Sequence, residues 1–165
     1  MTGMFTGVAH TAICVGDVEA ATAWYSEILG LRVLSPPYEL TGDAIERDMG
    51  ELVPSPVVVK AAIVGLDSDD HVIELIEYPG VAVDPDAVPR PPNLTRPGLT
   101  HVGLVCDDLE RTRADLESKG VSFLTAGFAD VAGLRTTWMQ DPWGTVLILL
   151  EKRDGSRPYW RQYLA

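Results

Sequence analysis

The chain has 165 residues, of which 46% are hydrophobic, and a formal net charge of −11. This length and hydrophobic content suit one compact domain or two small halves with a shared core, and they exclude a largely disordered chain. The acidic balance weighs against nucleic acid and anionic membranes as partners, and two cysteines, no signal pattern and no membrane-spanning apolar run predict a cytoplasmic protein without a disulfide framework.

The first predicted elements are a short strand and an amphipathic helix. The stretch VAHTAICVGDVE, residues 8–19, places His10 on an apolar strand that ends just before Asp17. Asp17 is a favourable N-cap and Gly30 a favourable helix stop. The apolar residues between them recur with helical spacing: Val18, Ala21, Tyr25 and Ile28. An extended segment, residues 31–34, follows, so the chain opens as β-α-β.

The next segment, residues 35–56, is rich in proline and acidic residues and is predicted to be a long loop. Loops of this length are often functional. We expect the part from Pro36 to Pro56 to be a mobile lid over a cavity, with Gly42 and Gly50 as hinges. An apolar strand with Glu74 then completes a first module at residue 79, and His71 in the preceding turn is expected to be solvated.

The rest of the chain repeats this pattern. Residues 80–98 are predicted to be a stiff linker, because six of the twelve prolines lie within residues 79–98. LTHVGLVCDDLE, residues 99–110, then matches residues 8–19 at an offset of 91, with His101 in the place of His10, Asp108 as N-cap and Gly120 as helix stop. Residues 121–124 are predicted to be extended like residues 31–34.

The module ends match as well, at an offset of 74, so that Glu77 corresponds to Glu151 and Glu74 to Ile148. The two offsets, 91 and 74, mean that the first module carries 17 extra residues, within residues 35–56. The second module is predicted to cover residues 99–152. Residues 153–165 form a basic, aromatic tail that is expected to pack on the body or on a partner subunit. The predicted fold is α+β, with two tandem β-α-β-β-β modules.

From residue 8 to residue 152 the sequence resembles the vicinal oxygen chelate superfamily of glyoxalases, bleomycin-resistance proteins and extradiol dioxygenases. The resemblance depends on four motifs in the right order: H-x-x-I-x-V-x-D at His10, V-I-E-L-I-E at Glu74, G-L-T-H-V-G-L-V at His101 and D-P-W-G at Asp141. It implies that each module forms a half-open sheet and that the two sheets enclose a cavity with a divalent metal.

The resemblance also implies a ligand set. Carried over by position, the metal ligands are His10, Glu74, His101 and the residue at 148, which here is isoleucine. Glu151 lies three residues further along the predicted strand, and an odd step points to the opposite face. Two imidazoles and one carboxylate suit Fe(II), and also Mn, Zn, Co or Ni with water completing the shell.

The chemistry that this set would support is bidentate chelation of a small substrate, followed by a lyase, isomerase or ring-opening oxygenase step. Since Ile148 cannot move a proton, we expect Glu74, or Glu46 or Glu51 of the extra segment, to act as the acid or base. The neighbouring positions are mostly small and apolar, which favours a largely apolar substrate. The residues predicted to contact it are Cys14, Tyr78, Trp138 and Ile148.

Two alternatives stay open at this point. The first is a metal-free binding protein that sequesters a drug or secondary metabolite, which Ile148 favours. The second is a protein whose modules serve only assembly, which the matched histidines disfavour. For the enzyme and for the binding protein we expect a small-molecule partner rather than nucleic acid or membrane. We also expect a homodimer, because half-open sheets leave edges that a second copy can cover.

Overall fold

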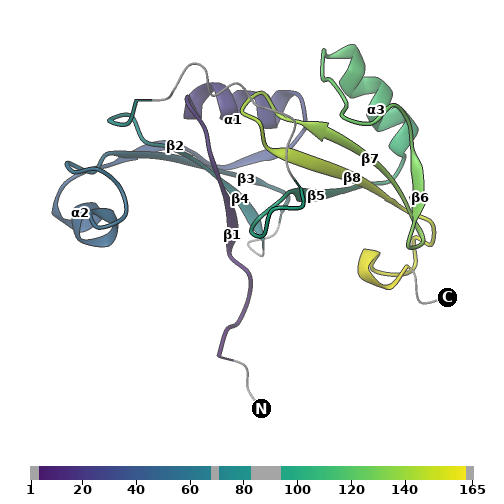
Figure 1. Ribbon diagram of the computed structural model, residues 1–165, viewed down its shortest axis with the longest axis horizontal. Coiled ribbons are helices and arrows are strands. Elements are labelled where there is room, and N and C mark those ends of the chain that lie inside the picture. Colours follow the sequence, from purple (N-terminus) through teal and green to yellow (C-terminus); the bar gives the residue numbers. More distant parts are fainter. Residues whose placement is uncertain (1–3, 68–70, 83–93, 163–165) are drawn as a thin grey trace. The chain divides into compact units, whose positions relative to one another are not determined.

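The computed structural model describes residues 4–67, 71–82 and 94–162. The chain divides into two units, residues 1–85 and 86–165, and each described unit holds one four-stranded sheet with one ten-residue helix (Figure 1). The division falls inside the predicted linker, residues 80–98, of which residues 83–93 lie outside the described part.

The first unit is a β-α-β-β-β module with one additional helix. Its sheet has the order β1-β4-β3-β2, in which β1 and β4 run parallel and the other neighbours run antiparallel. The elements are β1 (His10–Cys14), α1 (Val18–Glu27), β2 (Arg32–Leu40), α2 (Asp43–Met49), β3 (Val59–Gly65) and β4 (Val72–Glu77).

The second unit repeats this topology without the additional helix. Its sheet has the order β5-β8-β7-β6, again with one parallel pair, β5 and β8. The elements are β5 (Val102–Cys106), α3 (Leu109–Ser118), β6 (Ala129–Val131), β7 (Leu134–Gln140) and β8 (Val146–Lys152), followed by a short 3₁₀ turn at Tyr159–Arg161. The tandem repeat and the α+β class predicted from the sequence are therefore confirmed.

The two long helices begin and end where the sequence predicts. Asp17 accepts a hydrogen bond from the Ala20 N–H at 2.9 Å, and Asp108 accepts one from the Arg111 N–H at 2.9 Å. Side-chain acceptors at this position satisfy N–H groups that have no partner inside the helix. After the helices the chain reverses through Gly30 (φ +73°) and Gly120 (φ +85°), in the left-handed region that favours glycine.

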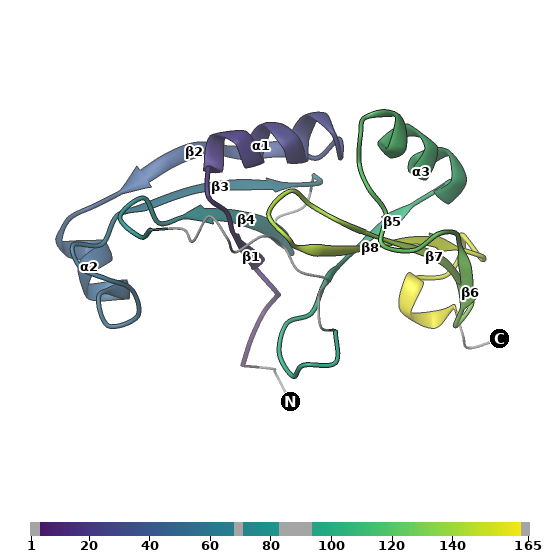
Figure 2. The ribbon, with the colours of Figure 1, turned by 45° about the horizontal axis from the view of Figure 1, so that its top comes forward.

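Each sheet has one face covered by its helix, α1 in the first unit and α3 in the second (Figure 2). Alternation along the strands sends one set of side chains to that face, and these form the core of each unit. In the first unit the set includes Ile13, Ala62, Val64, Ile73 and Leu75, all 5% exposed or less. We call the opposite side of each sheet its distal face.

The segment of residues 35–56 is not the plain loop that the sequence predicts. Residues 35–40 continue β2, and residues 43–49 form α2. The register of β2 against β3 shifts between Ser35 and Tyr38, across the two prolines Pro36 and Pro37. Because β2 is the edge strand of its sheet and is irregular at this point, it can hold prolines that would break a central strand.

The second unit differs from the prediction in its second strand. Residues 121–124 form no strand and make one isolated bridge, between Phe123 and Met139, and the edge strand β6 comes later, at Ala129–Val131. The Phe123 ring lies 4.3 Å from the Arg113 guanidinium on α3. Side-chain stacking and isolated backbone hydrogen bonds, such as that from the Leu124 N–H to the Trp138 carbonyl, thus hold this segment where the first unit uses a β-ladder.

The C-terminal segment packs on its own unit through Gln162, which is buried. The Gln162 side chain accepts a hydrogen bond from the Asp154 N–H at 2.9 Å and donates one to the Asp154 carbonyl at 2.8 Å. A Cβ atom at Gly133 would lie 2.5 Å from the Gln162 carbonyl oxygen, so the turn before β7 needs glycine. Within residues 4–67, 71–82 and 94–162, none of the helices has both the length and the apolar character to cross a membrane.

Candidate metal centre

The direction of each side chain on β4 follows from its contacts with the helix. The Glu77 carboxylate accepts a hydrogen bond from the Val18 N–H at the start of α1, at 2.8 Å, so Glu77 lies on the helix-covered face. Glu74 lies three residues earlier on the same strand and therefore points to the distal face. The strand phase predicted for Glu74 agrees with this arrangement.

His10 and Glu74 meet on that distal face. In the parallel register of β1 and β4, Ala12 is opposite Glu74, so His10 and Glu74 lie on the same side of neighbouring strands. His10 Nε2 lies 3.4 Å from Glu74 Oε2. The His10 side chain is 48% exposed and that of Glu74 21%, so both can be reached by a small ligand.

The remaining predicted contact residues of the first unit share this face. Cys14 follows His10 at even spacing on β1, and Tyr78 follows Glu74 at even spacing just beyond β4. Burial raises the pKa of the Cys14 thiol. Burial, and then the nearby Cys14 and Glu74, raise the pKa of the Tyr78 hydroxyl, which stays protonated at neutral pH.

Helix α2 closes one end of this face. Val57, Val59 and Ala61, which lie on β3 or two residues before it, form a buried cluster. The partly buried residues that pack on this cluster are Ile45, Met49, Val53, Ile76 and Tyr78. The extra segment is thus a wall beside Tyr78, and its mobility stays a prediction.

The second unit has the same arrangement of strands and helix, but an isoleucine stands at the position that corresponds to Glu74. The Glu151 carboxylate accepts a hydrogen bond from the Leu109 N–H at the start of α3, at 2.7 Å, as Glu77 does for α1. Ile148, three residues earlier, therefore occupies the distal face, opposite Gly103 on β5 and Trp138 on β7. The His101 and Trp138 rings meet edge to face, with centroids 4.9 Å apart.

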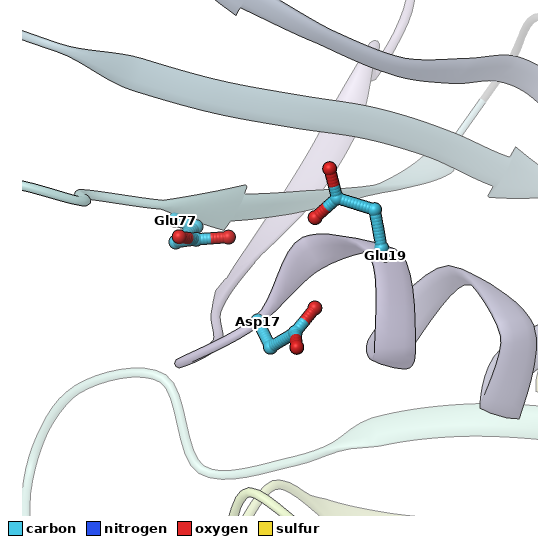
Figure 3. A group of neighbouring side chains, drawn as sticks. All are labelled: Asp17, Glu19 and Glu77. Carbon is cyan, nitrogen blue, oxygen red and sulfur yellow. The ribbon is translucent and has the colours of Figure 1, made fainter.

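The sequence pairs Glu77 with Glu151 across the two modules, but it does not reveal that both residues anchor a helix. Figure 3 shows Glu77 beside Asp17 and Glu19 at the start of α1. One carboxylate oxygen of each residue lies within 4.8 Å of those of the other two. Asp17 and Glu77 already accept helix N–H groups. This acidic cluster is therefore explained by capping of the helix N-terminus, where negative charge is also favourable.

The two acidic residues predicted in the extra segment have different surroundings. Glu46 on α2 accepts hydrogen bonds from the Ser55 hydroxyl and from the Val57 N–H, the latter at 2.8 Å. These bonds close the loop of residues 50–57 onto α2 and lower the pKa of the Glu46 carboxyl. Glu51 is exposed in the turn after α2. The Glu46 carboxylate is thus engaged in hydrogen bonds within its own segment, whereas Glu51 is exposed.

The hydrogen bonds of Glu46 predict that the stability of the loop of residues 50–57 depends on pH. Because the folded pKa is below its ordinary value of 4.5, the contribution of Glu46 to stability is complete above that value and is lost as the pH falls through the lowered pKa. Glu46→Ala removes both acceptor oxygens and should abolish this dependence and speed amide exchange at Val57, with Glu51→Ala as the control. Hydrogen exchange followed by NMR would show it, and unchanged Val57 protection in Glu46→Ala would contradict it.

Comparison with known protein sequences identifies the family of the chain. The model of the Glyoxalase/Bleomycin resistance protein/Dioxygenase superfamily matches residues 7–149. A curated relative, the uncharacterized protein YaeR of Escherichia coli (strain K12), is 30% identical over 145 residues, which cover 88% of this chain and 95% of YaeR. The chain therefore belongs to the Glyoxalase/Bleomycin resistance protein/Dioxygenase superfamily, as the sequence motifs predict.

Solved structures agree with this assignment at the level of the fold. A glyoxalase family protein from Bacillus cereus matches with a TM-score of 0.76 and 16% identity, over 93% of this chain and 98% of that one. Glyoxalase I of Leishmania major matches with a TM-score of 0.58 and 21% identity, over 90% and 88%. TnmS3, an antibiotic binding protein from a Streptomyces species, matches with a TM-score of 0.57 and 19% identity, over 91% and 98%.

Proposed function

We propose that the protein is a metal-dependent enzyme that binds a small, largely apolar, oxygen-bearing substrate. The observation that carries the proposal is the separation of 3.4 Å between His10 Nε2 and Glu74 Oε2 on the distal face. Two donors at about 2.1 Å from a common metal, at angles between 90° and 109°, are roughly 3.0–3.4 Å apart. Donor types and spacing both fit a divalent cation without rearrangement of the strands.

His101 is the third ligand in this proposal. It precedes Gly103 by two residues, as His10 precedes Ala12. His10 is the first residue of β1 and His101 directly precedes β5, and each of these strands runs parallel to the last strand of its unit. A set of two imidazoles and one carboxylate suits Fe(II), Mn, Co, Ni or Zn. When bound, such a metal would act as a Lewis acid toward two adjacent oxygen atoms of the substrate.

The other side chains determine which substrates and reactions are compatible. Cys14, Tyr78, Trp138 and Ile148 would provide the mainly apolar contacts. Glu74, or Glu51 from the turn after α2, would take or give a proton, because Ile148 cannot. A lyase, isomerase or ring-opening oxygenase step fits this set, in a cytoplasmic homodimer.

The second candidate is a metal-free binding protein for a drug or secondary metabolite. The observation that favours it is Ile148, which replaces the fourth donor by an apolar group beside Trp138. A solved antibiotic binding protein shares the fold. The two functions differ in one property that can be measured directly, which is the metal content of the protein as purified.

The test is metal analysis of untagged protein, followed by calorimetric titration with Zn(II), Mn(II), Co(II) and Ni(II). His10→Ala, Glu74→Gln and His101→Ala should each weaken binding at least about tenfold, or 1.4 kcal/mol. His71→Ala is the matched control, because His71 is exposed and lies in the turn before β4. If His71→Ala weakens binding as much as the other variants, or the wild type binds none of these metals and contains no iron as purified, the proposed metal centre is contradicted.

A further inference from the structure

The surroundings of His101 contain a feature that neither the fold nor the ligand set explains. Its imidazole contacts two side chains of its own unit, on different parts of the ring. Thr100 Oγ1 lies 2.8 Å from His101 Nδ1. The Trp138 indole meets the ring edge to face, with an interplanar angle of 74°.

The position of Trp138 makes this contact unusual. In the sheet order β5-β8-β7, His101 precedes β5 and Trp138 lies on β7, so the two residues are separated by a whole strand. Next-but-one strands lie about 9.5 Å apart, and small side chains could not touch across them. The two rings therefore lean toward each other over β8, on the face where Ile148 lies. Edge-to-face contact favours one ring orientation over others.

The backbone of Trp138 is held on both sides. It pairs with Ile148 on β8, and its N–H donates a hydrogen bond to Thr125 Oγ1 at 3.2 Å. Its carbonyl accepts one from the Leu124 N–H at 2.8 Å. A side chain on a backbone anchored in this way is a rigid support for its neighbour.

We infer that Thr100 and Trp138 are positioning residues that preset His101 as a metal ligand. His101 Nδ1–H donates a hydrogen bond to Thr100 Oγ1, Trp138 fixes the plane of the ring, and Nε2 keeps the free lone pair. Histidines that bind metals usually donate their other N–H group to a second partner in this way, which fixes the tautomer. The inference rests on the proposed function, because only a metal centre would need His101 to be oriented in this way. The tautomer and the ring orientation themselves are properties of the protein without metal.

His71 provides an internal contrast. Its contact with a threonine hydroxyl is made through the other ring nitrogen, Nε2, which lies 3.1 Å from Thr11 Oγ1. The same pair of residue types therefore occurs twice in the described chain with opposite ring nitrogens engaged. Thr11→Val consequently removes a hydroxyl from a histidine without affecting His101.

The first experiment measures the tautomers by NMR, from long-range ¹H–¹⁵N correlations of the three imidazoles in metal-free protein at a pH where histidine is neutral. We expect His101 as the Nδ1–H tautomer in wild type and in Thr100→Ser, and a mixture or the Nε2–H tautomer in Thr100→Val. Thr11→Val should leave His101 unchanged. An Nε2–H tautomer in wild type, or no change in Thr100→Val, would overturn the inference.

The second experiment measures affinity for Zn(II) and Co(II) in folded variants, checked by circular dichroism. Loss of a residue that orients a ligand typically costs 10- to 100-fold in metal affinity. We expect this loss for Thr100→Val and Trp138→Leu, near-wild-type affinity for Thr100→Ser and Trp138→Phe, and no change for the exposed control Trp160→Leu. Equal affinity in Trp138→Leu and Trp138→Phe would contradict the role of the aromatic ring.

The two experiments separate the inference from the proposed function. If wild type binds no metal while His101 has the expected tautomer and Thr100→Val changes it, the proposed function fails and the positioning of the ring stands. If wild type binds metal through His101 while the tautomer is Nε2–H, the positioning fails and the metal centre stands.

Discussion

Ile148→Glu is expected to bind divalent metal at least about tenfold more tightly than the wild type, a gain of 1.4 kcal/mol or more. The reason is the common register of the two units. Glu74 is opposite Ala12, two residues after His10, and Ile148 is opposite Gly103, two residues after His101. A carboxylate at 148 should therefore lie relative to His101 as Glu74 does relative to His10, where the nearest atoms are 3.4 Å apart.

The same substitution should lower stability more in the metal-free protein than in the metal-bound protein. Ile148 is partly buried beside Trp138, and a carboxylate placed there without a partner costs free energy of desolvation. We expect metal-free Ile148→Glu to melt at a lower temperature than wild type, and the difference to shrink when metal is added, because binding to the folded state adds to its stability. Affinity for the native, largely apolar substrate should fall.

The measurement is calorimetric titration of both forms with Zn(II), Mn(II) and Co(II), with thermal melts before and after saturation. Ile148→Gln is the matched control, since it has the shape of glutamate without the negative charge and should not tighten binding. If Ile148→Glu binds each metal no better than Ile148→Gln, residue 148 does not occupy the fourth ligand position of a metal site.

The parts of the site that follow from strand alternation were predictable from the sequence. Once the repeat fixes the strands, a step of three residues separates Glu74 from Glu77 and Ile148 from Glu151, and the two faces follow. The structure agrees, because Glu77 and Glu151 both bond to the first turn of a helix on the covered face. What holds His101 in place was not predictable, since Trp138 contacts it across an intervening strand.

The errors in the fold have physical causes as well. Pro36 and Pro37 indicate a loop by composition, but an irregular edge strand accommodates them, which local propensity cannot reveal. The strand β6 has three residues, all exposed, too few to show an alternating pattern. The role of Glu46 depends on Ser55 and Val57, nine and eleven residues away, in a loop whose closure no local pattern encodes.

The acids that anchor the two helices should matter more for stability than any exposed acid of the chain. The Val18 and Leu109 N–H groups belong to the first residues of their helices, so neither has a partner within the helix, and both residues are fully buried. Removal of the acceptor leaves a buried donor unsatisfied, which costs about 1–3 kcal/mol. We expect Glu77→Ala and Glu151→Ala each to lower the free energy of unfolding by this amount, or to lower Tm by roughly 2–4 °C for each kcal/mol.

Glutamine variants separate the hydrogen bond from the charge. Glu77→Gln and Glu151→Gln keep an acceptor oxygen at the same place and should retain most of the stability, losing only the favourable interaction of a carboxylate with the helix N-terminus, about 0.3–1 kcal/mol. Glu27→Ala, at the exposed end of α1, is the control and should change stability by less than about 0.5 kcal/mol. Urea denaturation and amide exchange at Val18 and Leu109 would measure these differences. A loss in Glu151→Gln as large as in Glu151→Ala would mean that charge, and not the bond to Leu109, anchors α3, and the same comparison at Glu77 would decide the matter for α1.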